Sequence, residues 1–170
     1  MVKGNDTRAH QRGRVATIRV ARPDDIGSIQ DVQHRAGRAA SDTFTAVMSA
    51  AIDDPERLVV VAEIDDLQVG WATTKFWPDA EGAAPAGQYL MGVTVAADFR
   101  RAGIGHALIA KRIEWIRHRT DRVMFFANAR NAASLAAHRA WRFEEIARGS
   151  EFRGISFDGG LGLLYRAQLT

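Results

Sequence analysis

Residues 98–119, DFRRAGIGHALIAKRIEWIRHR, join a glycine-containing turn to a segment with apolar residues at helical spacing. That spacing predicts a helix over residues 103–118 with one side in the core, and the apolar residues are Ile104, Leu108, Ile109, Ile113 and Ile116. The turn in front contains Gly103 and Gly105. Unpaired amides at a helix start favour negative charge, and glycine lets the backbone approach a phosphate. The stretch therefore predicts an anion site, although a tight structural turn has the same composition.

Two common nucleotide-binding motifs do not fit this turn. A P-loop places Lys and then Ser or Thr after its last glycine, whereas His106 follows Gly105 here. A Rossmann turn needs a third small residue where Leu108 stands, and an acidic residue at the end of the next strand, where Asn128 stands. The sequence therefore argues against a P-loop protein and against a dinucleotide oxidoreductase.

The remaining chain alternates strand and helix patterns without a linker or an internal repeat. Two β-branched runs around Asp65 and Asp66 predict a hairpin over residues 57–77. Strands are also predicted at 17–21, 88–96, 122–128, 143–152 and 161–169, and helices after Asp24 or Asp25, after 38–45 and over 131–141. This order predicts one α/β domain with a mixed sheet.

Charge and composition narrow the class of partner. The chain of 170 residues has no cysteine, which excludes disulfides and cysteine-based zinc sites or nucleophiles. Its net charge of +3 lies in residues 1–14, and the other residues are formally neutral. We therefore expect a disordered basic tail at 1–14, one domain over 15–170, and no nucleic-acid partner. Neither a signal peptide nor a membrane span is present, so a cytoplasmic protein without a membrane partner is predicted.

Two motifs at separate places carry a resemblance to the Gcn5-related N-acetyltransferases. Residues 93–105, VTVAADFRRAGIG, resemble the family's strand followed by Arg/Gln-x-x-Gly-x-Gly/Ala at a helix start, with Ala97 where relatives often have proline. Residues 131–143, NAASLAAHRAWRF, are similar to the family's second motif, in which Asn131, Ser134 and Phe143 match. The resemblance extends over about residues 17–168.

The resemblance implies both a fold and a reaction. The fold would be a single α/β domain with a mixed, mostly antiparallel sheet of about six to seven strands flanked by about four helices. The reaction would move an acetyl group from acetyl-CoA to a primary amine of a small molecule by direct attack in a ternary complex, without a metal. A catalytically silent acyl-CoA-binding or sensor module is an alternative. A protein acetyltransferase acting on N-termini or lysines is another, and a homodimer is left open.

The same resemblance implies the cofactor-binding residues. The amides of residues 101–106 would hold the pyrophosphate, and the backbone at Val93 and Val95 would pair with the pantetheine arm and polarise the thioester carbonyl. Asn131 would contact pantetheine or cap the last helix, and Ser134 would contact the cofactor or lie exposed. The full set is Val93, Thr94, Val95, Arg100, Arg101, Ala102, Gly103, Ile104, Gly105, His106, Asn131 and Ser134.

Two catalytic residues are predicted, each with a structural alternative. His138 stands where many relatives have a tyrosine that protonates the departing thiolate, and histidine occurs there in the branch that resembles phosphinothricin-type acetyltransferases. A lone histidine on a helix is also often structural. Phe126 stands where some relatives that act on protein N-termini have a glutamate. Glu63 and Asp98 are therefore the candidates for a general base, and Glu63 could equally be a solvent-facing strand residue.

Two further expectations concern the acceptor and the end of the last helix. Arg142 replaces the family's usual glycine before Phe143, which puts the way this helix ends in doubt. Acceptor specificity is expected from the first helix–loop segment, the hairpin and the 77–88 loop. The residues concerned are Asp42, Thr43, Phe44, Trp71, Trp77 and Tyr89, and none of them distinguishes one amine from another.

Overall fold

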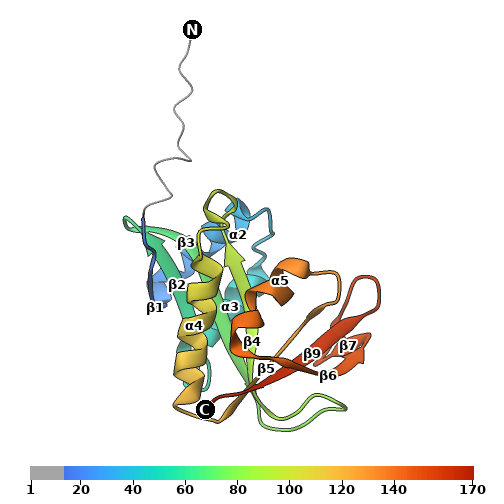
Figure 1. Ribbon diagram of the computed structural model, residues 1–170. Coiled ribbons are helices and arrows are strands. Elements are labelled where there is room, and N and C mark those ends of the chain that lie inside the picture. The colour runs from blue at the N-terminus through green and yellow to red at the C-terminus, as the bar shows by residue number, and fades with distance from the viewer. Residues whose placement is uncertain (1–13) are drawn as a thin grey trace.

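The computed structural model describes residues 14–170 and centres on a seven-stranded sheet (Figure 1). The strand order is β1-β2-β3-β4-β5-β9-β6, and every neighbouring pair is antiparallel except β4 and β5. The strands are β1 (Thr17–Val20), β2 (Val59–Ile64), β3 (Leu67–Trp77), β4 (Gly87–Val95), β5 (Arg122–Asn128), β6 (Glu144–Gly149) and β9 (Gly162–Gln168). The predicted mixed, mostly antiparallel sheet is confirmed.

Helices cover both faces of this sheet because residues of the central strands alternate between two cores (Figure 1). Val59 and Val61 pack under α2 (Ile26–Arg35) and α3 (Asp42–Asp53) on one face. Val60 and Ala62 pack on the other face, against α4 (Ile104–Arg117). With α5 (Ala132–Ala137), the described chain has the expected four α-helices, and short 3₁₀ turns η1 (Pro23–Asp25), η2 (Ala97–Phe99) and η3 (Arg139–Trp141) accompany them.

The predicted hairpin is formed by β2 and β3, which pair through a two-residue turn. Asp65 and Asp66 both have positive φ, at 49° and 64°. This is the backbone of a type I′ turn, whose twist matches that of the flanking strands. The alternating β-branched pattern and the Asp-Asp pair therefore located the hairpin correctly.

Strands β4 and β5 form a backbone ladder pair at one place only. Tyr89 and Met124 are their one recorded partner pair, whereas β5 pairs with β9 over its whole length. The parallel strands therefore separate beyond Tyr89 and leave room between their carboxyl-terminal parts. This opening lies next to the start of α4, because β4 leads through η2 into the glycine turn.

The last third of the chain departs from the predicted elements in two places. The helix expected over 131–141 ends at Ala137, and η3 then closes on Arg142, which adopts the left-handed conformation normally given to glycine, with φ 55°. The strand expected over 143–152 is interrupted, and a separate two-stranded hairpin forms from β7 (Glu151–Phe152) and β8 (Ile155–Ser156). Figure 1 shows this hairpin beside the ends of β6 and β9.

The predicted basic tail lies outside the described residues except for Arg14, whose guanidinium forms an ion pair with Asp65. Within residues 14–170, no helix is long and apolar enough to cross a membrane.

Candidate functional site

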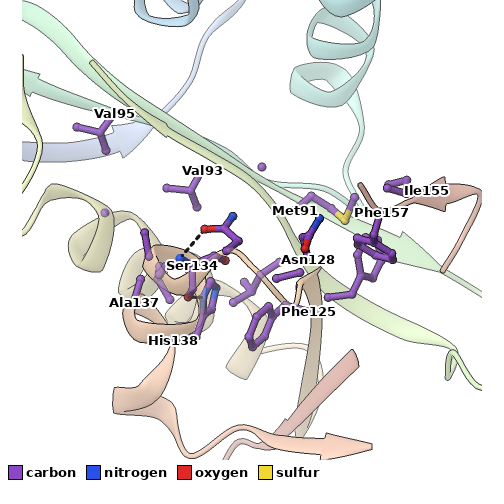
Figure 2. A pocket seen from close by; sticks show the side chains of 18 of the residues that line it. Met91, Val93, Val95, Phe125, Asn128, Ser134, Ala137, His138, Ile155 and Phe157 are labelled. Atoms are coloured by element: carbon purple, nitrogen blue, oxygen red, sulfur yellow. Dashed lines mark hydrogen bonds between the residues drawn. The ribbon is translucent and has the colours of Figure 1, made fainter. Parts of the chain in front are cut away.

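A cavity of about 470 Å³ occupies the opening between β4 and β5, with α5 along its side (Figure 2). Such a volume is within the range of small-molecule and cofactor sites. The strands contribute Leu90, Met91, Gly92, Val93, Val95, Phe125, Phe126, Ala127 and Asn128, and the α5 region contributes Asn131, Ala133, Ser134, Ala137 and His138. Arg38, Arg100, Gly105, Ile109, Ile155 and Phe157 complete the lining.

The glycine turn at one end of the cavity has unused backbone donors. Gly103 is the N-terminal cap of α4 with φ 78°, and the first helical hydrogen bond runs from the Ala107 amide to the Gly103 carbonyl at 3.0 Å. Within the described chain, the N–H groups of residues 101–106 donate to no carbonyl or side chain. A Cβ atom added at Gly105, which lines the cavity, would meet nothing within 4 Å. The turn therefore has the free amides and open space that an anion needs.

The arginines of the turn differ in what they contact. Arg100 donates from Nε to the Val95 carbonyl at 3.3 Å and from Nη2 to the Ala36 carbonyl at 3.1 Å. It thereby ties the end of β4 to the end of α2. Arg101 is exposed and has φ 62°. Ala102 and His106 are exposed as well, and the His106 ring packs at 4.6 Å from the Trp141 ring.

A β-bulge interrupts β4 where it passes the cavity. Ala72 faces Val93 but Thr74 faces Leu90, so Met91 and Gly92 together oppose one residue of β3. A Cβ atom at Gly92 would lie 3.0 Å from the Trp71 ring, so this position needs a residue without a side chain. The bulge therefore brings bare backbone to the cavity wall.

The buried side chain of Arg112 supports this bulge from α4. Its Nη1 atom donates to the carbonyls of Thr73 and Met91 at 2.8 Å each, and its Nε atom lies 3.3 Å from the Leu108 carbonyl. Burial lowers the pKa of Arg112 to about 9, and Nη2 has no partner within residues 14–170. The sequence analysis missed this residue, although a single basic residue inside the apolar stripe of the helix marks it.

Of the site residues predicted on β4 and around α5, all but Thr94 line the cavity. Val93 and Val95 line the cavity, whereas the buried Thr94 has its Oγ1 atom 3.5 Å from Arg38 Nη1. The Asn131 Oδ1 atom accepts from the Ser134 amide at 3.0 Å, so Asn131 caps α5 (Figure 2). Both residues also line the cavity, so capping does not exclude contact with a ligand.

His138 lines the cavity from the end of α5 but is nearly buried, with 7% of its surface exposed. Its ring stacks on Phe125 at 3.9 Å, and Nδ1 lies 2.7 Å from the Ser134 carbonyl. Burial lowers the pKa of His138 to about 4, the bond to Ser134 opposes that change, and the Arg112 charge adds to it. At pH 7 the ring is therefore neutral, with the Nδ1 proton held by Ser134. This arrangement gives no support to the proton-donating role expected of His138.

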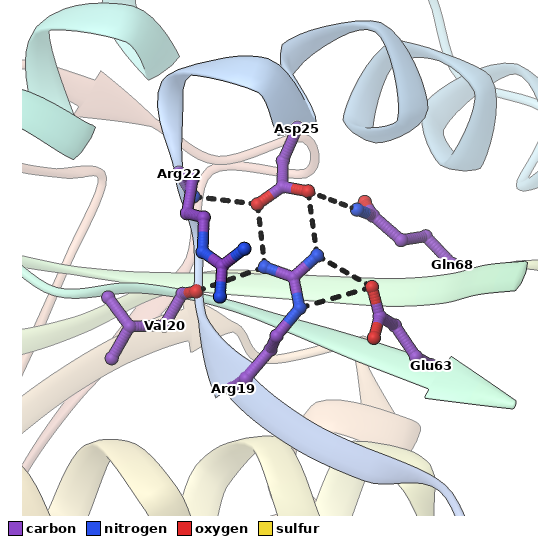
Figure 3. Close-up of polar contacts among 6 residues, drawn as sticks. All are labelled: Arg19, Val20, Arg22, Asp25, Glu63 and Gln68. Carbon is purple, nitrogen blue, oxygen red and sulfur yellow. Dashed lines mark hydrogen bonds and ion pairs between the residues drawn. The ribbon is translucent and has the colours of Figure 1, made fainter. Parts of the chain in front are cut away.

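Glu63 lies away from the cavity, and its Oε1 atom accepts from Arg19 Nε at 3.1 Å and from Nη2 at 2.6 Å (Figure 3). Arg19 also binds both carboxylate oxygens of Asp25 at 2.8 Å. The structure does not bring Glu63 to His138, and the Glu63 carboxylate is bonded to Arg19 instead of facing the cavity. The expected general-base role of Glu63 is therefore not supported by its position.

Asp25 is the centre of the cluster that holds Glu63. Besides Arg19, it accepts from the Arg22 amide and from Gln68 Nε2, each at 2.6 Å (Figure 3). These contacts, chiefly the bond from Arg19, lower the pKa of Asp25 to about 2 against the opposing effect of burial. Asp25 precedes α2 as expected for a cap, but its side chain joins β1 and β3 instead of capping the helix.

The residues expected to select the acceptor do not line the cavity. Phe44 and Trp71 belong to the core between α2, α3 and the sheet, and Trp77 packs edge-to-face on Tyr89 at 4.8 Å. Asp42 and Thr43 are exposed at the start of α3 and are likewise absent from the lining. The far end of the cavity is instead lined by residues of the unpredicted β7–β8 hairpin region, Ile155 and Phe157 (Figure 2).

Comparison with known families gives one match, to the model of the acetyltransferase (GNAT) family, over residues 24–143. That range is more than half of the chain and contains the glycine turn, β4, β5 and α5. No curated protein sequence matches the chain.

Solved structures with the same fold align with nearly the whole chain. The ribosomal-protein-alanine N-acetyltransferase of Brucella melitensis is 25% identical, with a TM-score of 0.72 over 90% of this chain and 99% of that one. A Salmonella typhimurium protein, yncA, was solved with its cofactor acetyl-CoA and is 20% identical, with a TM-score of 0.70 over 91% and 94% of the two chains. A protein assigned as a phosphinothricin N-acetyltransferase is 16% identical, with a TM-score of 0.70 over 92% and 99%.

Proposed function

Because this chain belongs to the acetyltransferase (GNAT) family and uses acetyl-CoA, we propose that it transfers the acetyl group to the primary amine of a small molecule by direct attack within a ternary complex. The observation that supports this proposal most is the cavity between β4 and β5, which has unbonded amides at one end and apolar side chains at the other. Both reactants can therefore lie in one continuous space.

The residues around the cavity fit acetyl-CoA. The free N–H groups of residues 101–106 would hold the pyrophosphate, and Gly105 leaves the space for it. The backbone of β4 at Val93 and Val95 has no β5 partner and would pair with the pantetheine arm. Acetyl-CoA supplies an activated thioester. One backbone N–H directed at its carbonyl oxygen is worth roughly 10²–10³ in rate.

Proton transfer has to proceed without a carboxylate in the described lining. Its charged residues are Arg38 and Arg100, and His138 is neutral at pH 7. The lowered pKa of His138, about 4, also makes its ring a weak proton acceptor, so we propose that the amine loses its proton to water. Positive groups also favour the neutral form of an approaching amine, so positioning supplies much of the remaining catalysis.

The size of the cavity supports a small acceptor. Ile155 and Phe157 bound its far end, and a volume of about 470 Å³ also has to contain part of the cofactor. A protein N-terminus is the second candidate, because the Brucella melitensis structure bears the name of an enzyme that acts on ribosomal protein.

The test is release of free thiol from acetyl-CoA with purified protein. A panel of small primary amines is compared with short peptides that begin with alanine or contain lysine. Turnover confined to small amines supports the proposal, and a preference of tenfold or more for peptides contradicts it. Calorimetric binding of acetyl-CoA without any thiol release would instead identify a silent binding module.

A further inference from the structure

The far end of the cavity is apolar and largely aromatic. Met91 and Phe126 line it from the two strands. Ile155 and Phe157 approach from the β7–β8 hairpin region, opposite Met91 (Figure 2). The Phe126 and Phe157 rings meet edge-to-face at 5.9 Å, and 40% of Ile155 is exposed. Apolar side chains grouped in a cavity and left open to solvent are typical of a surface that a ligand covers.

No charged group lines this far end. Arg38 and Arg100 lie at the opposite end, where they bind the side chain of Thr94 and the carbonyl of Val95. The described lining contains no Asp, Glu or Lys. A second charge on the acceptor would therefore be buried here without a partner.

The one polar side chain at the far end, that of Asn128, is held in place by the local backbone. Asn128 donates from Nδ2 to the Asp158 carbonyl at 2.7 Å, and its Oδ1 atom accepts from the Arg130 amide at 2.9 Å. Both the nitrogen and the oxygen of its side-chain amide thus form hydrogen bonds with the local backbone. Each group keeps one unused site, but Asn128 is neutral and these two bonds fix its orientation, so it offers no ionic partner to a second charge on the acceptor.

We propose that the acceptor carries its primary amine on an apolar group, aromatic or branched aliphatic, with no second charge beside it. This inference rests on the proposed function. The amine nitrogen forms a bond to the acetyl carbon and the C–S bond of acetyl-CoA breaks. The amine loses one proton and the departing thiolate gains one, so the products are an acetamide and coenzyme A. The apolar group lies against Met91, Phe126 and Phe157.

The test compares amines that differ in the group attached to the nitrogen. 2-Phenylethylamine and 3-methylbutylamine are measured against cadaverine and β-alanine by thiol release. We expect kcat/KM to be at least tenfold higher for the apolar amines. An equal or higher value for cadaverine or β-alanine, or for an alanine peptide, overturns the inference.

Two variants test whether the far end sets this preference. Ile155→Asp puts a carboxylate into an exposed position of the lining, and we expect it to lower kcat/KM for 2-phenylethylamine at least tenfold and to raise it for cadaverine. Leu161→Asp is the control, because Leu161 is similarly exposed, at 37%, but does not line the cavity. The KM for acetyl-CoA should be unchanged in both. Equal effects of the two variants overturn the inference.

A binding measurement separates failure of this inference from failure of the proposed function. 2-Phenylethylamine and cadaverine are titrated calorimetrically into protein saturated with coenzyme A, with and without Ile155→Asp. Absence of turnover together with tighter binding of 2-phenylethylamine, lost in the variant, overturns the proposed function but supports an apolar amine site. Absence of any binding preference overturns the inference.

Discussion

The Nη1 atom of Arg112 lies 2.8 Å from the carbonyl oxygen of Met91, within the core and directly behind the cavity wall. It also donates to the Thr73 carbonyl, so one side chain forms hydrogen bonds with the backbone of both strands at the bulge. Arg112→Met leaves two buried carbonyls unpaired. We expect the free energy of unfolding to fall by about 2–4 kcal/mol and kcat to fall at least tenfold.

Arg112→Lys and Arg117→Met complete this first prediction. Lysine keeps a charge but lacks the planar fork, so an intermediate loss is expected. Arg117 is exposed on the same helix, and its replacement should change neither quantity. Chemical denaturation and steady-state kinetics measure both, and an Arg112→Met protein with unchanged kcat would contradict a positioning role for Arg112.

The second prediction separates the two glycines of the turn. A side chain at Gly105 projects into the cavity without backbone strain, so Gly105→Leu should weaken acetyl-CoA binding at least tenfold while thermal stability is retained. Gly103 has φ 78°, and Gly103→Ala should cost about 1–2 kcal/mol of stability. Calorimetric titration and melting curves test both. Unchanged affinity in Gly105→Leu would show that the turn is not the cofactor site.

The third prediction follows from the pKa of His138, which is lowered from 6.5 to about 4, chiefly by burial. The unfolded chain binds this proton below pH 6.5, whereas the folded protein stays neutral down to about pH 4. Stability is therefore full above pH 6.5 and is lost as the pH falls toward 4, by about 3 kcal/mol at ~1.4 kcal/mol per pKa unit. His138→Gln should lose correspondingly less stability over this range in urea denaturation. Identical curves for the two proteins would refute the assignment.

The fourth prediction concerns the Asp25 cluster. Asp25→Asn leaves Arg19 without its bidentate partner and should lower the free energy of unfolding by about 2–4 kcal/mol. Glu63→Gln removes a more exposed contact and should cost less than about 1 kcal/mol with kcat unchanged. If Glu63→Gln instead lost kcat tenfold or more with a normal melting temperature, its predicted base role would return.

Local patterns were sufficient for much of the fold. The apolar repeat predicted a helix over 103–118 where α4 spans Ile104–Arg117, and the Asp-Asp turn was found because both determinants lie within a few residues. The role of Asn131 as a helix cap could be predicted for the same reason, because the amide that it accepts from is close by in the sequence. The anion-binding turn could also be predicted from the sequence, because its free amides depend only on where one helix begins.

The parts of the site that the sequence did not reveal depend on contacts between distant segments. Arg112 contacts carbonyls on two strands. Ile155 lines the cavity from the β7–β8 hairpin, whose short strands leave no clear pattern in the sequence. Glu63 looked available because Arg19, its partner, lies 44 residues away in the chain. Such contacts depend on how the strands and helices are arranged in space. The periodicity of residues along the chain does not predict that arrangement.

The single Tyr89–Met124 pair has a mechanical consequence. The seven strands therefore form two half-sheets, β1–β4 and β5–β9–β6, which are joined by this one ladder pair, by α4 and by side-chain packing such as that of Leu90 and Phe125. Any molecule that lies between β4 and β5 touches both halves, so its binding energy also becomes cohesion between them. Ligand binding is therefore expected to raise the stability of the domain as a whole.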